Sequence, residues 1–333
     1  MTSQGGMETS RTAYPSGTIA WCLVLILAVA VPPLVGGYLT SMLILIAIWT
    51  IMCFSMNLIY GYTGQLSLGH AAFLGIGAYS FGLLTVKLHL GFWPAFAAAI
   101  AITGLFGFLI GIPALKLRGP YFILVTLGFA VIIGVIVIAW IDLTGGANGL
   151  AGIPRPDPIP LPWGGKLRFD SLLNMYYFVL VFLVLTIMFC RRLIHSLVGK
   201  IFIAISHNEN LTESLGINTL SQKVLSFTLS AMLAGIAGVL YATYNIVISP
   251  EVTHFARGMD VVAYLIVGGA GTMAGPMIGT FILMAVPEVL QVVPYVKTLI
   301  NGIILMLFLI FLPSGVMGGF NSTLGKLLKS RTG

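Results

Sequence analysis

Long apolar stretches alternate with short polar ones along almost the whole chain. A helix needs about 20 apolar residues to cross the roughly 30 Å hydrocarbon core of a bilayer. Stretches of that length recur throughout the sequence, with few charges inside them. They cover residues 18–36, 40–60, 66–86, 92–113, 120–141, 172–190, 219–246, 275–293 and 297–312. The pattern therefore predicts an all-α, polytopic membrane protein.

A shorter apolar run, 259–270, affects the expected number of crossings. Counting it gives about ten transmembrane helices, some broken or half-crossing, and places both termini on one side. Omitting it places the termini on opposite sides. Lysine and arginine concentrate in cytoplasmic loops, and with the even count most of the 16 such residues fall on the side of the N-terminus. We therefore expect both termini in the cytoplasm.

The transmembrane domain is predicted over 18–312, between cytoplasmic tails at 1–17 and 313–333. Within this domain, 142–170 is expected to be an external loop, because the prolines of IPRPDPIPLPWGG forbid a regular helix. The mixed polar segment 191–220 is compatible with helix and is predicted to be cytoplasmic. The first apolar run lacks an obvious A-x-A-like site, so we expect a retained span rather than a cleaved signal.

Composition supports the membrane class. The chain is 58% hydrophobic and only 8% charged, with a mean hydropathy of +1.05, whereas soluble domains average about 25% charged residues. Basic residues at the ends of apolar runs explain the net charge of +7, so no nucleic-acid partner is expected. Cys22, Cys53 and Cys190 lie within apolar runs or at their ends, without CxxC or zinc spacing, which predicts buried thiols.

A glycine-rich, polar sequence, GYTGQLSLGHAAFLGIGAY at residues 61–79, interrupts the apolar pattern. Non-helical backbone at membrane depth needs protein or water around it, and transporters place such breaks along the substrate path. Close packing of helices through small residues is an equally open explanation. An ionisable group in a span suggests function, but a neutral structural histidine is the alternative. The candidate pathway residues here are Gly64, Gln65, Ser67, Gly69 and His70.

A second glycine-rich sequence, GGAGTMAGPMIG at residues 268–279, lies between apolar runs in the other half of the chain. Paired interruptions of this kind indicate an internal repeat with the substrate path between its halves. Gly271 and Gly275 are therefore added as candidate pathway residues. The similarity is loose, and chance is the alternative in a chain with 40 glycines.

The segment 191–220 contains a short amphipathic helix, expected near 207–215. Gly216 follows, and glycine commonly ends helices at this position. Glu209 and Glu213 are spaced i, i+4, so their side chains share one face. Two interpretations stay open, an ordinary connector between spans and a docking helix for a cytoplasmic partner.

Five sequence blocks are spread over most of the chain after Met56. The two glycine-rich sequences are the first and the last. Between them lie LKLRGPYFILVTLGFA at 115–130, LTGGANGLAGIP at 143–154, and ESLGIN followed by KVLSFTLSAMLAGIAGVLYA. The set resembles the permease subunits of branched-chain amino acid ABC importers, the Liv permease type. Only the first 40 or so residues lie outside the resemblance.

The resemblance implies a transport subunit of the bacterial cytoplasmic (inner) membrane. In such importers two permease subunits, here a paralogous heterodimer, form the pathway. Two cytoplasmic ATPase subunits drive it, and a periplasmic or lipid-anchored binding protein delivers substrate. The chain has no G-x-x-x-x-G-K-[ST] loop, so ATP and Mg²⁺ are expected on the ATPase subunits. We expect no catalytic residue, cofactor or metal in this chain.

The ESLGIN block is similar to the EAA coupling loop of ABC importers. The resemblance implies ATPase coupling by Glu209, Glu213, Ser214 and Gly216. The chain departs from the family pattern nearby, with Ser206 and His207 where relatives usually carry an arginine and an acid. Leu211 and Thr212 stand where relatives usually carry alanines. These departures leave the particular ion pairs of the loop open.

Two other functions compete with import of branched-chain amino acids. One is a stand-alone secondary transporter or channel coupled to protons or ions through His70 or Glu288. The partner-facing loop and the lack of a clear charged relay in the spans favour the ABC class over it. The other is an ABC permease for urea or short amides, because the binding protein sets much of the selectivity.

Overall fold

The computed structural model describes residues 26–117, 119–160 and 166–289, together with 302–303, 305–307, 310 and 315–317. Helices dominate these residues, which confirms the predicted all-α class. The long helices are α2 (Gly37–Met56), α3 (His70–Val86), α4 (Phe92–Ala114), α5 (Pro120–Ala139), α7 (Leu172–His195) and α10 (Thr219–Asn245). Shorter helices are α6 (Ile141–Thr144), α8 (Leu197–His207), α9 (Glu209–Ser214), α11 (Phe255–Gly268) and α12 (Gly275–Val289).

Single turns and short strands complete the described chain. A π-helical turn, η2 (Asn57–Gly61), extends α2, and 3-10 turns form η1 (Pro32–Leu34), η3 (Gly146–Asn148) and η4 (Pro250–Thr253). Strand β1 (Leu150–Ala151) pairs antiparallel with β4 (Val247–Ile248), with Leu150 opposite Ile248. Strand β2 (Ile159–Pro160) pairs antiparallel with β3 (Lys166–Leu167).

Within the described residues, five helical stretches are long and apolar enough to cross a membrane. They are Gly37–Gly61, Phe92–Ala114, Pro120–Ala139, Leu172–His195 and Thr219–Asn245, and they match predicted runs. The other predicted crossings are shorter or reach beyond the described residues. Helix α3 begins at His70, later than the predicted start of the apolar run at residue 66, and residues 62–69 are not helical.

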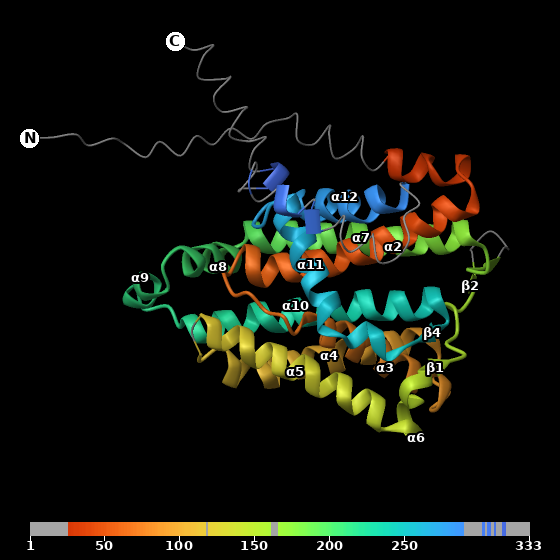
Figure 1. Cartoon of the computed structure of the whole chain (residues 1–333), viewed down its shortest axis with the longest axis horizontal. Coiled ribbons are helices and arrows are strands. Elements are labelled where there is room, and N and C mark those ends of the chain that lie inside the picture. Colours follow the sequence, from red (N-terminus) through yellow and green to blue (C-terminus); the bar gives the residue numbers. More distant parts are fainter. Residues whose placement is uncertain are drawn as a thin grey trace, which may run out of the picture.

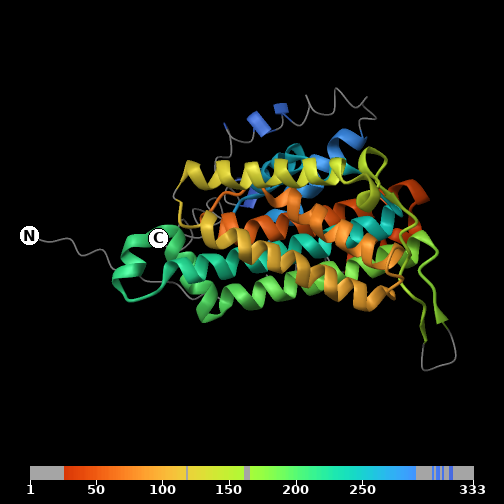
Figure 2. The same cartoon turned by 90° about the horizontal axis from the view of Figure 1, so that it is seen from below.

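The long helices lie roughly side by side, and the connections gather at two ends (Figures 1 and 2). Helices α8 and α9 form one end, which we call the α9 end. Helix α6 with β1 and β4 forms the other, the α6 end. The segments predicted as the external loop (142–170) and the cytoplasmic loop (191–220) thus lie at opposite ends. Which end faces the cytoplasm stays a prediction.

Helix α10 lies in the core, against α3 and α4. Small residues let these backbones approach closely: a Cβ on Gly77 would lie 2.6 Å from the Cα of Gly235. Likewise, a Cβ on Gly107 would lie 2.5 Å from the Cβ of Ala231. At least Gly77 of the 61–79 sequence therefore serves close helix packing, which is one of the two interpretations left open by the sequence.

The short apolar run 259–270 forms most of α11 and runs obliquely to the long helices (Figure 1). Its 14 residues span about 21 Å at 1.5 Å per residue, less than the roughly 30 Å hydrocarbon core. On length alone, α11 is a partial crossing.

The loop at the α6 end contains short strands and irregular segments where the structure describes it. Residues 152–158 are irregular, and the β-pairs flank them. Arg155 donates a hydrogen bond to the carbonyl of Asp170, 2.6 Å away. Cys53 and Cys190 are free and buried, as predicted. Cys22 and residues 1–17 lie outside the described residues, as does nearly all of 313–333.

Candidate functional site

The candidate site begins where α2 changes into the π-helical turn η2. Asn57 opens this turn and is completely buried. Its side-chain amide donates to the carbonyl of Thr272 at 2.8 Å and accepts from the backbone N–H of Gly271, also at 2.8 Å. Asn57 thus pairs with one backbone carbonyl and one backbone N–H of a loop that lies more than 200 residues later in the chain. Single π-turns inside α-helices are frequent at functional sites.

The two glycine-rich sequences meet at this point. A Cβ on Gly61 would overlap the backbone nitrogen of Gly271, so these two segments of the chain touch backbone to backbone. Gly271 has a φ of +74°, which favours glycine. Gly275 is buried, and its N–H donates to the hydroxyl of Thr272 at 3.0 Å. We call residues 57–70 together with 268–275 the glycine junction.

The sequence suggested the pairing of these segments only as a loose repeat, and Asn57 was not among the predicted site residues. A polar amide at the end of an apolar run, just before a glycine-rich sequence, was the available signal. Polar side chains inside a span are rare and commonly mark function or helix contacts.

The predicted residues of segment 64–69 have different surroundings. Gly64 is exposed, with a φ of +76°, and faces the backbone of Ser206 in α8. Gln65 is half-buried, and its N–H donates to the carbonyl of Ile59 at 3.0 Å. Ser67 is buried, and its hydroxyl accepts from the N–H of Gly69 at 3.3 Å. The segment therefore runs from the surface near α8 into the core.

Gly69 lies directly against α5. A Cβ at this position would lie 2.7 Å from the carbonyl oxygen of Thr126. The hydroxyl of Thr126 accepts a hydrogen bond from the N–H of Leu68 at 3.2 Å. One threonine thus satisfies a backbone group that the break in the helix would otherwise leave unpaired, which membrane-embedded backbone requires.

His70 opens α3 and is completely buried. Its Nε2 lies 2.6 Å from the hydroxyl of Ser230, and Phe73 and Phe227 pack edge-on against the ring. Its Nδ1 has no hydrogen-bond partner in the described part of the chain. Surrounded by aromatic rings and a hydroxyl, His70 fits a hydrogen-bonded core histidine better than a proton carrier. Glu288, the other proposed coupling group, accepts a hydrogen bond from Tyr38.

Further hydroxyls join the glycine junction to α10. Thr63 and Ser226 lie 2.8 Å apart, hydroxyl to hydroxyl. The hydroxyls of Ser55 and Ser230 each donate to the backbone carbonyl of the other residue, both at 2.7 Å. These neutral hydrogen bonds hold the end of α2, the break and the start of α3 onto one face of α10.

Helix α9 forms the other predicted site. The side chain of Asn208 caps its start by accepting from the N–H of Leu211 at 3.0 Å, a favourable N-cap arrangement. Gly216 follows its end with a φ of +82°, which confirms the prediction that glycine ends this helix. The observed helix, Glu209–Ser214, lies within the predicted range.

The acidic pair of α9 shares one face, as its spacing predicts, and that face points to α10. Glu209 forms an ion pair of 2.6 Å with Lys223. Thr219 donates to Glu213 at 2.5 Å. Ser214 donates to the carbonyl of its own neighbour Leu211, at 2.8 Å. The carboxylates expected to meet a partner are therefore held by donors of this chain.

Two exposed leucines lie on the outward side of this region, one within α9 and one directly after it. The side chains of Leu211 and Leu215 are 59% and 74% exposed, and their i, i+4 spacing places them next to each other. Leu211 is one of the departures from the alanines usual at this place.

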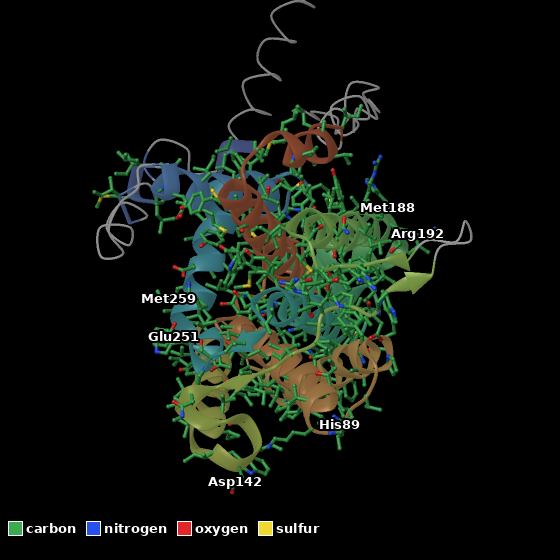
Figure 3. The ribbon with its side chains drawn as sticks, turned by 90° about the vertical axis from the view of Figure 1, so that its right-hand side faces the viewer. His89, Asp142, Met188, Arg192, Glu251 and Met259 are labelled. Atoms are coloured by element: carbon green, nitrogen blue, oxygen red, sulfur yellow. The ribbon has the colours of Figure 1, made fainter. Side chains whose placement is uncertain are left out.

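A separate apolar pocket of about 440 Å³ lies along α7. In Figure 3, Met188 marks this flank, opposite Met259 of α11. Arg191 and His195 are its charged or ionisable lining residues. None of the predicted pathway residues lines it, although Met273 and Met277 flank Gly275. In the described residues, no three His, Cys, Asp or Glu side chains gather as a metal site.

Comparison with known proteins identifies the family. The sequence profile of the family described as branched-chain amino acid transport system / permease component matches residues 38–312. The chain belongs to this family. The described residues contain five membrane-length apolar helices, so this permease is a multi-pass membrane protein, and its family is one of transport subunits.

Several relatives carry the same description in their names. This permease is 32% identical over 311 residues to the high-affinity branched-chain amino acid transport system permease protein LivM of Escherichia coli (strain K12). The alignment covers 88% of this chain and 73% of the relative. LivH of the same strain is 27% identical over 289 residues, covering 81% of this chain and 91% of the relative. No solved structure matches.

Proposed function

We propose that this chain forms one half of the translocation pathway of an ATP-binding-cassette importer for branched-chain amino acids. The observation that carries the proposal is α9, a capped six-residue helix at one end of the molecule, with one exposed leucine in it and a second directly after it. Burying a leucine side chain stabilises by about 1.5–3 kcal/mol. A partner with an apolar groove would therefore bind α9 through Leu211 and Leu215.

The partner in this proposal is a cytoplasmic ATPase subunit, one for each permease. ATP and Mg²⁺ bind to the ATPases, and this chain binds no cofactor. A substrate-binding protein meets the permease at the α6 end, which faces away from the cytoplasm. The membrane is the bacterial inner membrane.

The second permease subunit is a paralogue of this chain. The support is that LivM and LivH of Escherichia coli are named as permease proteins of the high-affinity branched-chain amino acid transport system and that this chain is similar to both. Substrate passes along the glycine junction, where the break between α2 and α3 places non-helical backbone and the polar residues Gln65, Ser67 and His70 along one segment. Similarity to relatives named as branched-chain amino acid permease proteins supports these substrates over urea and short amides.

Co-purification from membranes tests the proposal. The chain is expressed with its neighbouring transport subunits, and the bound ATPases are identified and counted. Leu211→Ala/Leu215→Ala should reduce the ATPases recovered by about tenfold or more, because two buried leucines contribute well over 1.4 kcal/mol.

The matched control is Leu88→Ala at the α6 end, a leucine that is 66% exposed. It should leave ATPase recovery unchanged. If the wild-type protein purifies without ATPases and an ion gradient drives its leucine transport, it is instead a secondary transporter.

A further inference from the structure

Four polar residues of α10 form a buried stripe along one face. Thr219, Lys223, Ser226 and Ser230 follow one another at i, i+4, i+7 and i+11, and this spacing keeps all four side chains on one side of a helix. All four are buried. Polar groups are costly to bury without partners, so the contacts of each are informative.

The first half of the stripe holds α9. Lys223 pairs with Glu209 at 2.6 Å, and the two side chains are 4% and 22% exposed. The same ammonium group lies 3.4 Å from the carbonyl oxygen of Leu115, at the end of α4. Thr219 donates to Glu213. Lys223 thus joins three helices, and removing one partner of a buried pair is strongly destabilising.

The second half of the stripe holds the glycine junction. Ser226 contacts Thr63, and Ser230 contacts His70 and Ser55. Helix α10 is one continuous helix from Thr219 to Asn245. One side of it therefore holds α9 at its start and the broken segment further along.

The turn between α9 and α10 does not fix the angle between these two helices. It consists of residues 215–218, and its Gly216 has no atom within 4 Å of a Cβ placed on it. A glycine turn in open space bends easily. The side-chain contacts therefore fix the angle between the two helices.

We infer that Lys223, through its ion pair with Glu209, is a positioning residue that makes α9 and α10 move together, so that ATPase movements reach the glycine junction. This inference rests on the proposed function. Without the ion pair, α9 would still bind the ATPase through its leucines, but it would turn on the Gly216 hinge instead of moving α10.

The test measures how many ATP molecules are hydrolysed for each leucine imported. Complexes with both ATPases and the binding protein are reconstituted in proteoliposomes. Lys223→Met removes the charge and keeps the length of the side chain. We expect the complex to assemble and hydrolyse ATP, while ATP consumed per leucine rises roughly fivefold or more. The matched control, Lys200→Met on the exposed surface of α8, should keep the wild-type ratio.

A double-mutant cycle separates coupling from stability. Glu209→Gln alone should raise the ratio, and the variant carrying both changes should be no worse than Lys223→Met, because both changes break the same pair. A purely structural role would lower the amount of complex, or uptake and hydrolysis together, and leave the ratio unchanged. That result overturns the inference. Should Lys223→Met fail to accumulate, the ratio in Glu209→Gln decides by the same criterion.

The outcomes also distinguish this inference from the proposed function. If wild-type protein recovers no ATPase, the proposed function fails. If the wild type is coupled and both variants keep its ratio, only the role of Lys223 fails.

Discussion

At the glycine junction, backbone lies against backbone and neutral side chains complete the hydrogen bonds. At the α9 end, in contrast, an ion pair holds one face of a short helix and leaves two leucines exposed on the other. The first region has no space for larger residues, because its close backbone contacts are possible only where glycine has no side chain. The second has space around its hinge and long side chains that can adjust. The difference suggests that the junction shifts only as one unit with α10, whereas α9 moves with that unit only while its ion pair holds.

The largest expected effect is at the junction. Gly69→Leu should abolish uptake, because its Cβ alone would approach the carbonyl oxygen of Thr126 to 2.7 Å and overpacking costs about 1–3 kcal/mol or more. Leucine uptake in whole cells and the amount of folded protein are measured together. Gly128→Ala is the control, because nothing lies within 4 Å of that position. Normal uptake by Gly69→Leu would remove the contrast between the two regions.

An intermediate effect is expected at the hinge of α9. Gly216→Val should reduce stimulated ATP hydrolysis and uptake together, because a β-branched residue resists the φ of +82°, at a cost of about 1–2 kcal/mol. The position is otherwise open, so the effect is conformational rather than steric. Gly216→Asn, which tolerates this φ better, should retain more of both rates. Equal loss in the two variants would point to a contact instead of a conformation.

The smallest effect on uptake is expected at His70. The amide of His70→Gln keeps Ser230 as one possible partner and leaves its other polar groups unpaired, so stability should fall by about 1–3 kcal/mol while uptake by the folded protein is retained. Uptake should remain at every pH between about 6 and 8, the range in which histidines titrate. Uptake assays across this range measure it. A loss of pH dependence that the wild type possesses would show that His70 carries a proton and is not only structural.

The sequence predicted what local patterns determine. Apolar runs identified the spans, because hydrocarbon requires continuous apolar helices. Gly216 identified the end of α9, because few residues other than glycine adopt a positive φ at a helix end. The Glu209 and Glu213 spacing correctly put both carboxylates on one face.

The partners of these groups were not predictable, because they lie far away in sequence. The donors that turn the acidic pair inward, Thr219 and Lys223, belong to the next helix. Asn57 completes a loop at Gly271 and Thr272, and no local pattern links the two. For His70, the sequence did not show that Ser230, 160 residues later, lies beside its Nε2, and its role stays a prediction.

The contact between Gly61 and Gly271 limits how genetic repair can occur. A damaging side chain at one position of a tight contact is commonly compensated by a smaller residue at the other. Neither partner can become smaller here, since each already carries only a hydrogen. Suppressors of a Gly61 substitution should therefore arise in residues that can shift the whole 268–275 loop, such as Asn57, and never at Gly271 itself.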